Sequence, residues 1–195
     1  LTVSGTLSSA DAIWSHTGDI TVGGLVTTTG PNTVFSGTGA LNFNSGMFIN
    51  TNNGAAVFLF GRTLNLDGTS TFENGFGIGT SDGATINLAP GATFDFQADS
   101  PIYHVGGTLS TFNNDGTLRK SEGAGTTSIA INVNNTGTVE VQTGTLTVGA
   151  GTTSGPVSVS AAATFGANTQ DFLAASSITG AGSASLSNSQ VRGTY

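Results

Sequence analysis

Apolar and polar residues alternate along most of the chain, and this period of two is typical of strands that bury one face. Within 93–99, Phe94, Phe96 and Ala98 fall on one side and the polar residues on the other. The alternation recurs at 20–22, 41–43, 63–67, 86–88, 129–133, 139–141, 146–148 and 157–159. The pattern predicts an all-β protein of many short strands with threonine outward. The only helix-like window, 168–177, is short and is interpreted as a turn or bulge.

Glycine followed by threonine or alanine recurs ahead of these strands. The positions are Gly54, Gly68, Gly83, Gly91, Gly107, Gly116, Gly137 and Gly144. Most gaps between them are near multiples of about seven to eight residues, one short strand plus one tight corner. Three such units make a coil of roughly twenty-odd residues. We therefore predict a right-handed parallel β-helix, a β-solenoid, with strands stacked at about 4.8 Å and glycine or asparagine at the corners. An antiparallel β-sandwich is the alternative.

Asparagine and phenylalanine refine this prediction. The segments 113–116 and 134–137 are interpreted as corners where stacked asparagine side chains form hydrogen-bonded ladders. Nine of the 12 phenylalanines lie between Phe43 and Phe112, which predicts an aromatic column. Core packing is favoured over an exposed sugar-binding platform, because Phe94 and Phe96 share the inward face. The isolated residues Trp14, Tyr103 and Tyr195 are better candidates for exposed contacts.

Composition excludes several classes of protein. Glycine (30), threonine (32), serine (21) and asparagine (16) supply about half of the 195 residues. With Lys+Arg 4, Asp+Glu 11 and a net charge of -7, the chain lacks the cationic face that nucleic acid requires. There is no cysteine, and the longest apolar run, 55–60, is far short of the ~18 residues of a membrane span.

The order of segments resembles the long tandem repeats of very large secreted bacterial proteins. The segments are 14–25, 61–68, 91–96, 112–121, 134–146 and 178–182, of which the Asn-Asn-x-Gly-Thr stretches are the most specific. The resemblance covers almost the whole chain and implies a β-solenoid, adhesin-like or filamentous surface protein. No catalytic residues are attached to that family.

Joining the two ends of the chain recreates an internal pattern. Reading residues 193–195 into 1–7 gives Gly-Thr, five further residues, then Gly-Thr-Leu, as in 137–146. We therefore interpret 1–195 as a single solenoid unit, either one repeat of a longer array or a protomer that stacks end to end. Solenoid ends expose unpaired strand edges and normally need caps, and neither end of the sequence predicts one.

Enzymatic chemistry is poorly supported by the sequence. A polysaccharide lyase needs cations and a base, and only Arg62, Arg119, Lys120 and Arg192 are present as cations. Arg119 and Lys120 are adjacent, so on a strand they point to opposite faces. Glycosidases need two carboxyls about 5–9 Å apart.

Candidate carboxyls do not form an evident pair. Asp95 and Asp99 share a face but lie about 13 Å apart along a strand. A pair across coils, formed from Asp67, Glu73 or Asp82, stays open, although solvated outward charges are the favoured interpretation.

Nucleophilic and metal sites have no motif. The only histidines are His16 and His104, no Gly-x-Ser-x-Gly elbow is present, and His16 is expected at the surface. No catalytic, cofactor-binding or metal-binding residues are predicted. A structural Ca²⁺ at a corner is compatible with Asp and carbonyl oxygens, but no calcium motif supports one.

The sequence therefore predicts a non-enzymatic structural or adhesive protein, extracellular or on the cell surface, that forms a rigid spacer or fibre. Its expected partners are copies of itself and cell-surface glycans, not nucleic acid, and no membrane span is expected. The alternatives are a carbohydrate-active β-helix enzyme and a glycan- or ice-binding module. A binding module of that kind predicts regular threonine columns on a flat face, whereas the threonines are spread over many positions without a fixed Thr-x-Thr register.

Overall fold

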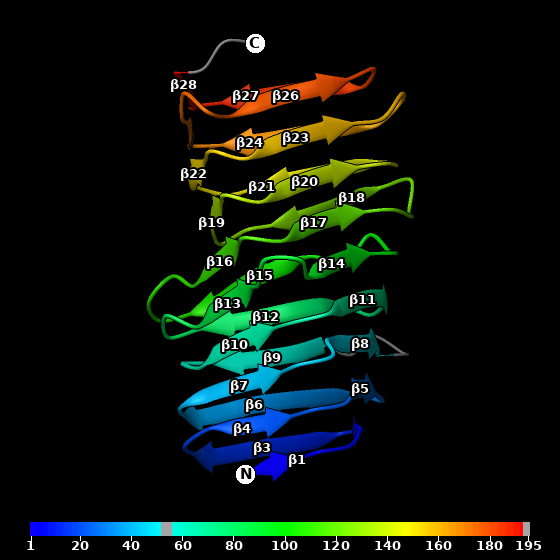
Figure 1. Ribbon diagram of the computed structural model, residues 1–195, viewed down its shortest axis with the longest axis vertical. Helices are drawn as coiled ribbons and strands as arrows, with labels where there is room; N and C mark the ends of the chain where they lie inside the picture. The colour runs from blue at the N-terminus through cyan, green and yellow to red at the C-terminus, as the bar shows by residue number, and fades with distance from the viewer. Residues whose placement is uncertain (52–55, 193–195) are drawn as a thin grey trace.

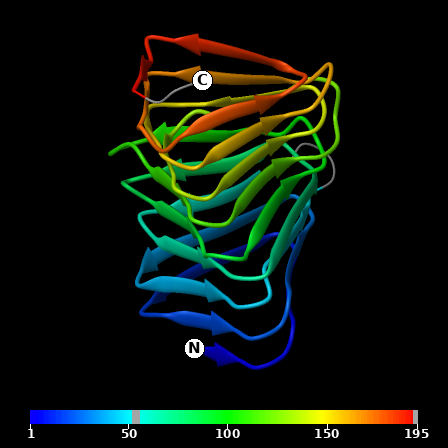
Figure 2. The same ribbon diagram turned by 45° about the horizontal axis from the view of Figure 1, so that its top comes forward.

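The computed structural model describes residues 1–51 and 56–192. It is an all-β parallel solenoid of about nine coils, with about 21 residues in each coil (Figure 1). Each coil contributes one strand to each of three parallel sheets, and the 45° view shows the coils stacked around a common interior (Figure 2). The predicted parallel β-solenoid is confirmed, and the antiparallel sandwich is wrong because every strand pair is parallel.

The three sheets are defined by their strands in spatial order. Sheet A contains β1 (Thr2–Val3), β4 (Ile20–Val22), β7 (Ala40–Phe43), β10 (Thr63–Leu66), β13 (Thr85–Leu88), β16 (Thr111–Asn114), β19 (Asn132–Asn135), β22 (Gly151–Thr153), β25 (Gln170–Phe172) and β28 (Gln190–Val191). Sheet B contains β2 (Leu7–Ser9), β5 (Val26–Thr29), β8 (Met47–Asn50), β11 (Thr69–Asn74), β14 (Thr93–Phe96), β17 (Thr117–Lys120), β20 (Thr138–Val141), β23 (Pro156–Val159) and β26 (Ser177–Gly180). Sheet C contains β3 (Ala12–Thr17), β6 (Asn32–Thr38), β9 (Ala56–Phe60), β12 (Gly77–Ser81), β15 (Ile102–Gly106), β18 (Thr126–Ile129), β21 (Thr145–Val148), β24 (Thr164–Asn168) and β27 (Ser183–Ser187).

Alternation along each strand builds the core. In β10, Leu64 and Leu66 are buried while Thr63 and Asn65 face outward, and the neighbouring strands repeat this pattern in register. The inward residues of all three sheets form one continuous hydrophobic cluster that runs along the axis. The window 168–177 is not helical, but the turn interpretation missed β25, which lies within it. None of the described segments forms a helix long and apolar enough to span a membrane.

Threonine occupies the first outward position of many strands, and several of these positions stack. Sheet B carries the column Thr69, Thr93, Thr117 and Thr138, in register from coil to coil. Sheet A carries Thr63, Thr85 and Thr111, and sheet C carries Thr126, Thr145 and Thr164. The Thr-x-Thr pattern is not repeated from coil to coil, because Thr71 is followed by Asp95 and Thr147 by Gly166, but single threonine positions do stack. Unequal corner lengths hide the columns in the sequence, because stacked threonines lie 19 to 26 residues apart.

An asparagine ladder crosses five coils on the outer face of sheet A. Each asparagine after the first donates an Nδ2–H to the Oδ1 of the preceding coil's asparagine at 2.8–3.0 Å. The members are Asn42, Asn65, Asn87, Asn113 and Asn134. The predicted ladder is confirmed, but its place is corrected, because Asn113 and Asn134 lie within β16 and β19 and not at corners. Asn114 and Asn135 point inward instead and form a second, buried hydrogen bond of 2.6 Å.

The corner glycines serve two different purposes. Gly68 has a positive φ of 70°, as the corner interpretation requires. Gly137 does not have a positive φ, but a Cβ there would lie 2.2 Å from the carbonyl oxygen of Gly116 in the preceding coil. Close stacking of successive corners therefore explains the second kind of glycine. Gly54 lies outside the described residues.

The phenylalanine cluster divides between the core and the surface. The inward members are Phe43, Phe72, Phe94, Phe96 and Phe112, which are buried, and Phe94 and Phe112 meet edge to face at 5.9 Å. The remaining four, Phe48, Phe58, Phe60 and Phe76, are half-buried or exposed. Core packing is thus confirmed for five of the nine and wrong for four, which lie on outward strand positions or in a turn.

Sheet C changes width part-way along the solenoid. The corner between sheets C and A takes a longer stretch of chain in one coil, from Ile102 to Phe112, than in the next coil, from Ile129 to Val133. As a result β15 pairs with β18 only at Ile102 and Ile129. The green segment between β15 and β16 projects from the side of the stack (Figures 1 and 2).

Candidate functional site

Arg62 lies inside the corner between sheets C and A, with 1% of its surface exposed. Its guanidinium donates to five backbone carbonyl oxygens of the two preceding coils, at 2.9–3.4 Å. Burial lowers the pKa of Arg62, and the charge of Asp19 partly opposes this effect. Because its donors are occupied by backbone, Arg62 holds corners together and cannot serve as a substrate-binding cation.

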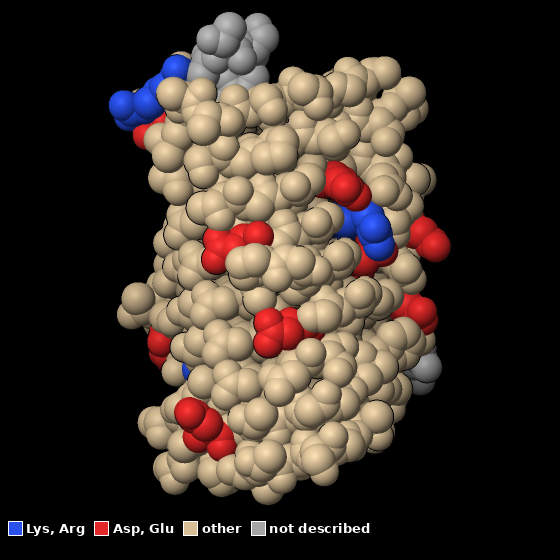
Figure 3. All heavy atoms as spheres, viewed as in Figure 1, with Lys and Arg blue, Asp and Glu red and all other residues tan. Residues whose placement is uncertain are grey.

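The outer face of sheet B carries a column of alternating charge. Asp95, Arg119 and Glu140 are in register on β14, β17 and β20, and Arg119 Nη2 lies 2.8 Å from Asp95 Oδ2. The hydrogen bond to Asp95 raises the pKa of Arg119, and Glu140 contributes in the same direction. Elsewhere charge is sparse, and uncharged residues cover most of the face in Figure 3.

Lys120 points to the opposite side from Arg119, as predicted, and is fully buried. Its Nζ donates to Asp99 Oδ1 at 2.6 Å and to the carbonyl oxygen of Glu122 at 2.9 Å. The hydrogen bond from Lys120 lowers the pKa of Asp99, and the backbone N–H of Gly125 adds to this effect while desolvation opposes it. Asp95 and Asp99 are therefore bound to different cations. The expectation that they share a strand face is wrong, because Asp99 is exposed and follows the end of β14.

The remaining candidate carboxylates do not converge. Asp67, Glu73 and Asp82 belong to one coil but lie after β10, on β11 and after β12, which are strands of three different sheets. His16 is exposed on β3 and His104 is half-buried on β15, four coils away along sheet C. Within residues 1–51 and 56–192, no group of three His, Cys, Asp or Glu side chains could hold a metal ion.

Sheet C has the most distinctive outer face. None of its nine described strands contains Asp, Glu, Lys or Arg. In its first half β3 and β6 mix apolar and polar outward residues. On β9 and β15 the outward residues Phe58, Phe60, Tyr103 and Val105 form what we term the aromatic patch. The rings of Phe58 and Phe60 are 5.6 Å apart, and Val105 is 51% exposed.

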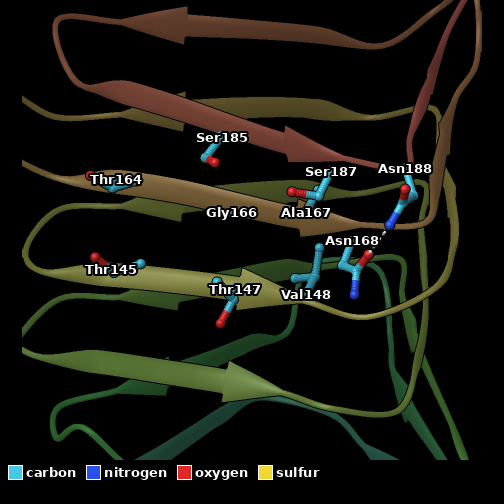
Figure 4. Close-up of a pocket in the computed structure, with 10 residues that line it drawn as sticks. All are labelled: Thr145, Thr147, Val148, Thr164, Gly166, Ala167, Asn168, Ser185, Ser187 and Asn188. Atoms are coloured by element: carbon cyan, nitrogen blue, oxygen red, sulfur yellow. Dashed lines mark hydrogen bonds between the residues drawn. The ribbon is translucent and has the colours of Figure 1, made fainter.

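The second half of the same face carries hydroxyl groups. Thr145 and Thr147 on β21 stack on Thr164 and Gly166 of β24 and then on serines of β27 (Figure 4). A shallow depression of about 450 Å³ lies over these strands. Figure 4 shows Gly166 at its centre, and a Cβ there would lie 2.4 Å from the methyl group of Thr147.

The isolated aromatic residues have different environments. Trp14 was expected to be exposed, but it faces inward in the first coil, packs against the core and donates Nε1–H to Ser9 Oγ at 3.0 Å. Tyr103 faces outward as expected, and burial raises the pKa of its phenol. Tyr195 lies outside the described residues.

The sequence interpretation missed the aromatic patch, although one signal for it was present. Residues 56–60 do not alternate between apolar and polar. All five are apolar, so the outward residues Phe58 and Phe60 are apolar as well. A strand with two apolar faces either lies beneath another layer or displays a hydrophobic surface. No described element covers β9, so it displays one.

Comparison of the chain with models of known protein families, with curated protein sequences and with solved structures finds no match.

Proposed function

We propose that this chain is a non-catalytic structural and adhesive unit of an extracellular protein, which extends as a rigid solenoid through axial continuation of its coils. The observation that carries the proposal is the pairing of the outermost strands. Among residues 1–51 and 56–192, β1, β2 and β3 at one end and β26, β27 and β28 at the other each pair on one side only. Their free edges are templates for another coil, from the same chain or from a second copy.

The two ends also expose core residues that another coil would cover. At one end Ile178, Ala184, Leu186 and Val191 line an apolar depression of about 330 Å³. At the other end Val3, Leu7 and Trp14 are only partly buried although they pack against the core. Stacking one end on the other would remove both apolar surfaces from water, which is favourable at about 25 cal/mol per Å².

A tandem fusion of two copies tests this axial continuation. If the ends fit, the fusion unfolds as one cooperative unit with a higher melting temperature than the single chain, because each coil is stabilised by its neighbours. Leu186→Asp in the first copy places a charge in the junction and should remove the gain. The same substitution in the second copy lies at the free end and should preserve it.

Two results would contradict the proposal. One is a fusion that melts as two independent units at the temperature of the single chain. The other is an equal effect of Leu186→Asp in either copy. Electron micrographs of the single chain give a second measurement, in which filaments of constant width are the expected result.

A further inference from the structure

The outer face of sheet C is neutral over its whole length. All nine strands, from β3 to β27, lack Asp, Glu, Lys and Arg, whereas sheet B carries the column Asp95, Arg119 and Glu140. A polyanion such as nucleic acid or a uronate polymer finds no complementary charge there. The chemistry of this face therefore selects an uncharged ligand.

The aromatic patch is continuous because a glycine lies at its centre. Phe58, Gly79 and Tyr103 occupy one column on β9, β12 and β15. A Cβ on Gly79 would lie 2.7 Å from Cδ1 of Phe58 and 3.0 Å from Cγ2 of Val105. Glycine thus lets the Phe58 ring and Val105 close over β12, which gives an unbroken apolar surface across three coils.

Hydroxyl groups continue the face beyond the aromatic patch. Thr126, Thr145 and Thr164 form one column, and Ser128 and Thr147 begin another. Successive hydroxyls in a column recur at the coil spacing of about 4.8 Å. The side chains of Thr145 and Thr164 are directed to the outside over the shallow depression (Figure 4).

We propose that the outer face of sheet C binds a neutral, unbranched β-1,4-linked glycan. A pyranose ring with equatorial substituents has apolar C–H faces, which stack on aromatic rings, and a hydroxyl edge, which hydrogen-bonds to threonine and serine. A β-1,4-linked chain is a ribbon whose two faces suit the aromatic patch and whose hydroxyl edges suit the threonine columns. The inference rests on the adhesive part of the proposed function and names its ligand.

Binding is measured with two probes, cellohexaose and chitohexaose, by calorimetry, and with microcrystalline cellulose and chitin by co-sedimentation. The wild-type chain is expected to bind at least one of these glycans. The double variant Phe58→Ala/Tyr103→Ala should weaken binding by about ten-fold or more, because truncated aromatic anchors dominate such losses. The matched control is Phe48→Ala, an equally half-buried outward phenylalanine on β8 of sheet B, which should bind as the wild type does.

Isosteric substitutions test the hydroxyl columns. Thr145→Val/Thr164→Val removes two hydroxyls from sheet C, and Thr117→Val/Thr138→Val removes two from the corresponding column of sheet B. Only the first pair should weaken glycan binding. Circular dichroism and melting temperature confirm that each variant is folded before its binding is compared.

The proposal is overturned if the folded wild-type chain binds none of the four glycans, or if Phe48→Ala weakens binding as much as the sheet C variants do. It is also overturned if Phe58→Ala/Tyr103→Ala changes sedimentation of the protein and leaves glycan binding intact, since the patch would then contact a second copy. The tandem fusion tests axial continuation separately. A chain that binds glycan but whose fused copies melt independently would reject the structural role and leave the glycan proposal standing.

Discussion

At the scale of single residues, the few cations of this chain mainly hold the solenoid together. Arg62 and Lys120 are buried, and their N–H groups donate hydrogen bonds to backbone carbonyl oxygens and to Asp99. A buried carbonyl without a partner costs roughly 1–3 kcal/mol, so a corner that turns carbonyl oxygens inward needs such a donor. Arg62 satisfies carbonyls from two neighbouring coils at once, which links three coils through one side chain.

Arg62→Met tests this function of the guanidinium. Methionine keeps much of the apolar stem but removes every donor, and we expect the free energy of unfolding to fall by roughly 2–4 kcal/mol. The control is Arg192→Met, which removes an exposed arginine paired with Asp171 at 2.7 Å and should change stability little. Urea denaturation measures both, and equal midpoints for the two variants would show that the carbonyls of this corner do not depend on Arg62.

At the scale of elements, the asparagine ladder works against local preference. Asparagine is depleted in strands, yet one outward column of sheet A is asparagine in five successive coils because each side chain bonds to a neighbouring coil. Asn87 is central, since it donates to Asn65 and accepts from Asn113. Stacked amides of this kind are available only where identical residues lie in register.

Asn87→Thr separates the ladder from strand propensity. Threonine is the better strand former, so propensity alone predicts a gain, whereas loss of two hydrogen bonds predicts a fall in stability of about 1–2 kcal/mol. The matched control is Asn132→Thr, which lies on the same face, at the position that Thr111 fills in the preceding coil. Chemical denaturation should show Asn87→Thr destabilised and Asn132→Thr unchanged or stabilised, and a stabilised Asn87→Thr would reject the ladder as a source of stability.

Strands and coil length were predictable from the sequence where a single local pattern determines them. Alternation gave β10 and β14, and glycine spacing gave the length of a coil, because both arise from local geometry. Properties that depend on neighbouring coils were not predictable from local spacing. Trp14 was expected outside because it is isolated in the sequence, but its strand turns it inward above Ser9. Phe58 was assigned to the core with the other phenylalanines, but the burial pattern of β9 places it outward, in register with Gly79.

At the scale of the whole molecule, strand pairing is continuous along sheets A and B but is nearly interrupted in sheet C. Sheets A and B keep four or more paired positions between β13 and β16 and between β14 and β17. Sheet C keeps one, Ile102 with Ile129, because the chain turns its corner earlier in the next coil. The last part of β15 therefore has β12 on one side and no paired strand on the other.

Amide hydrogen exchange tests whether this interruption opens the molecule locally. The carbonyl oxygen of Ile102 accepts a hydrogen bond from the N–H of Ala130 in the next coil. Because backbone groups two residues apart in a strand point the same way, the N–H of His104 also faces the next coil, where no strand pairs with it. Thr80 is the matched position on β12 and has β15 beside it. We expect the His104 amide to exchange about a hundred-fold faster than that of Thr80, because exchange reports local opening at unpaired edges. Equal protection of the two amides, measured by nuclear magnetic resonance, would show that the edge of β15 is covered and that the solenoid opens only as one unit.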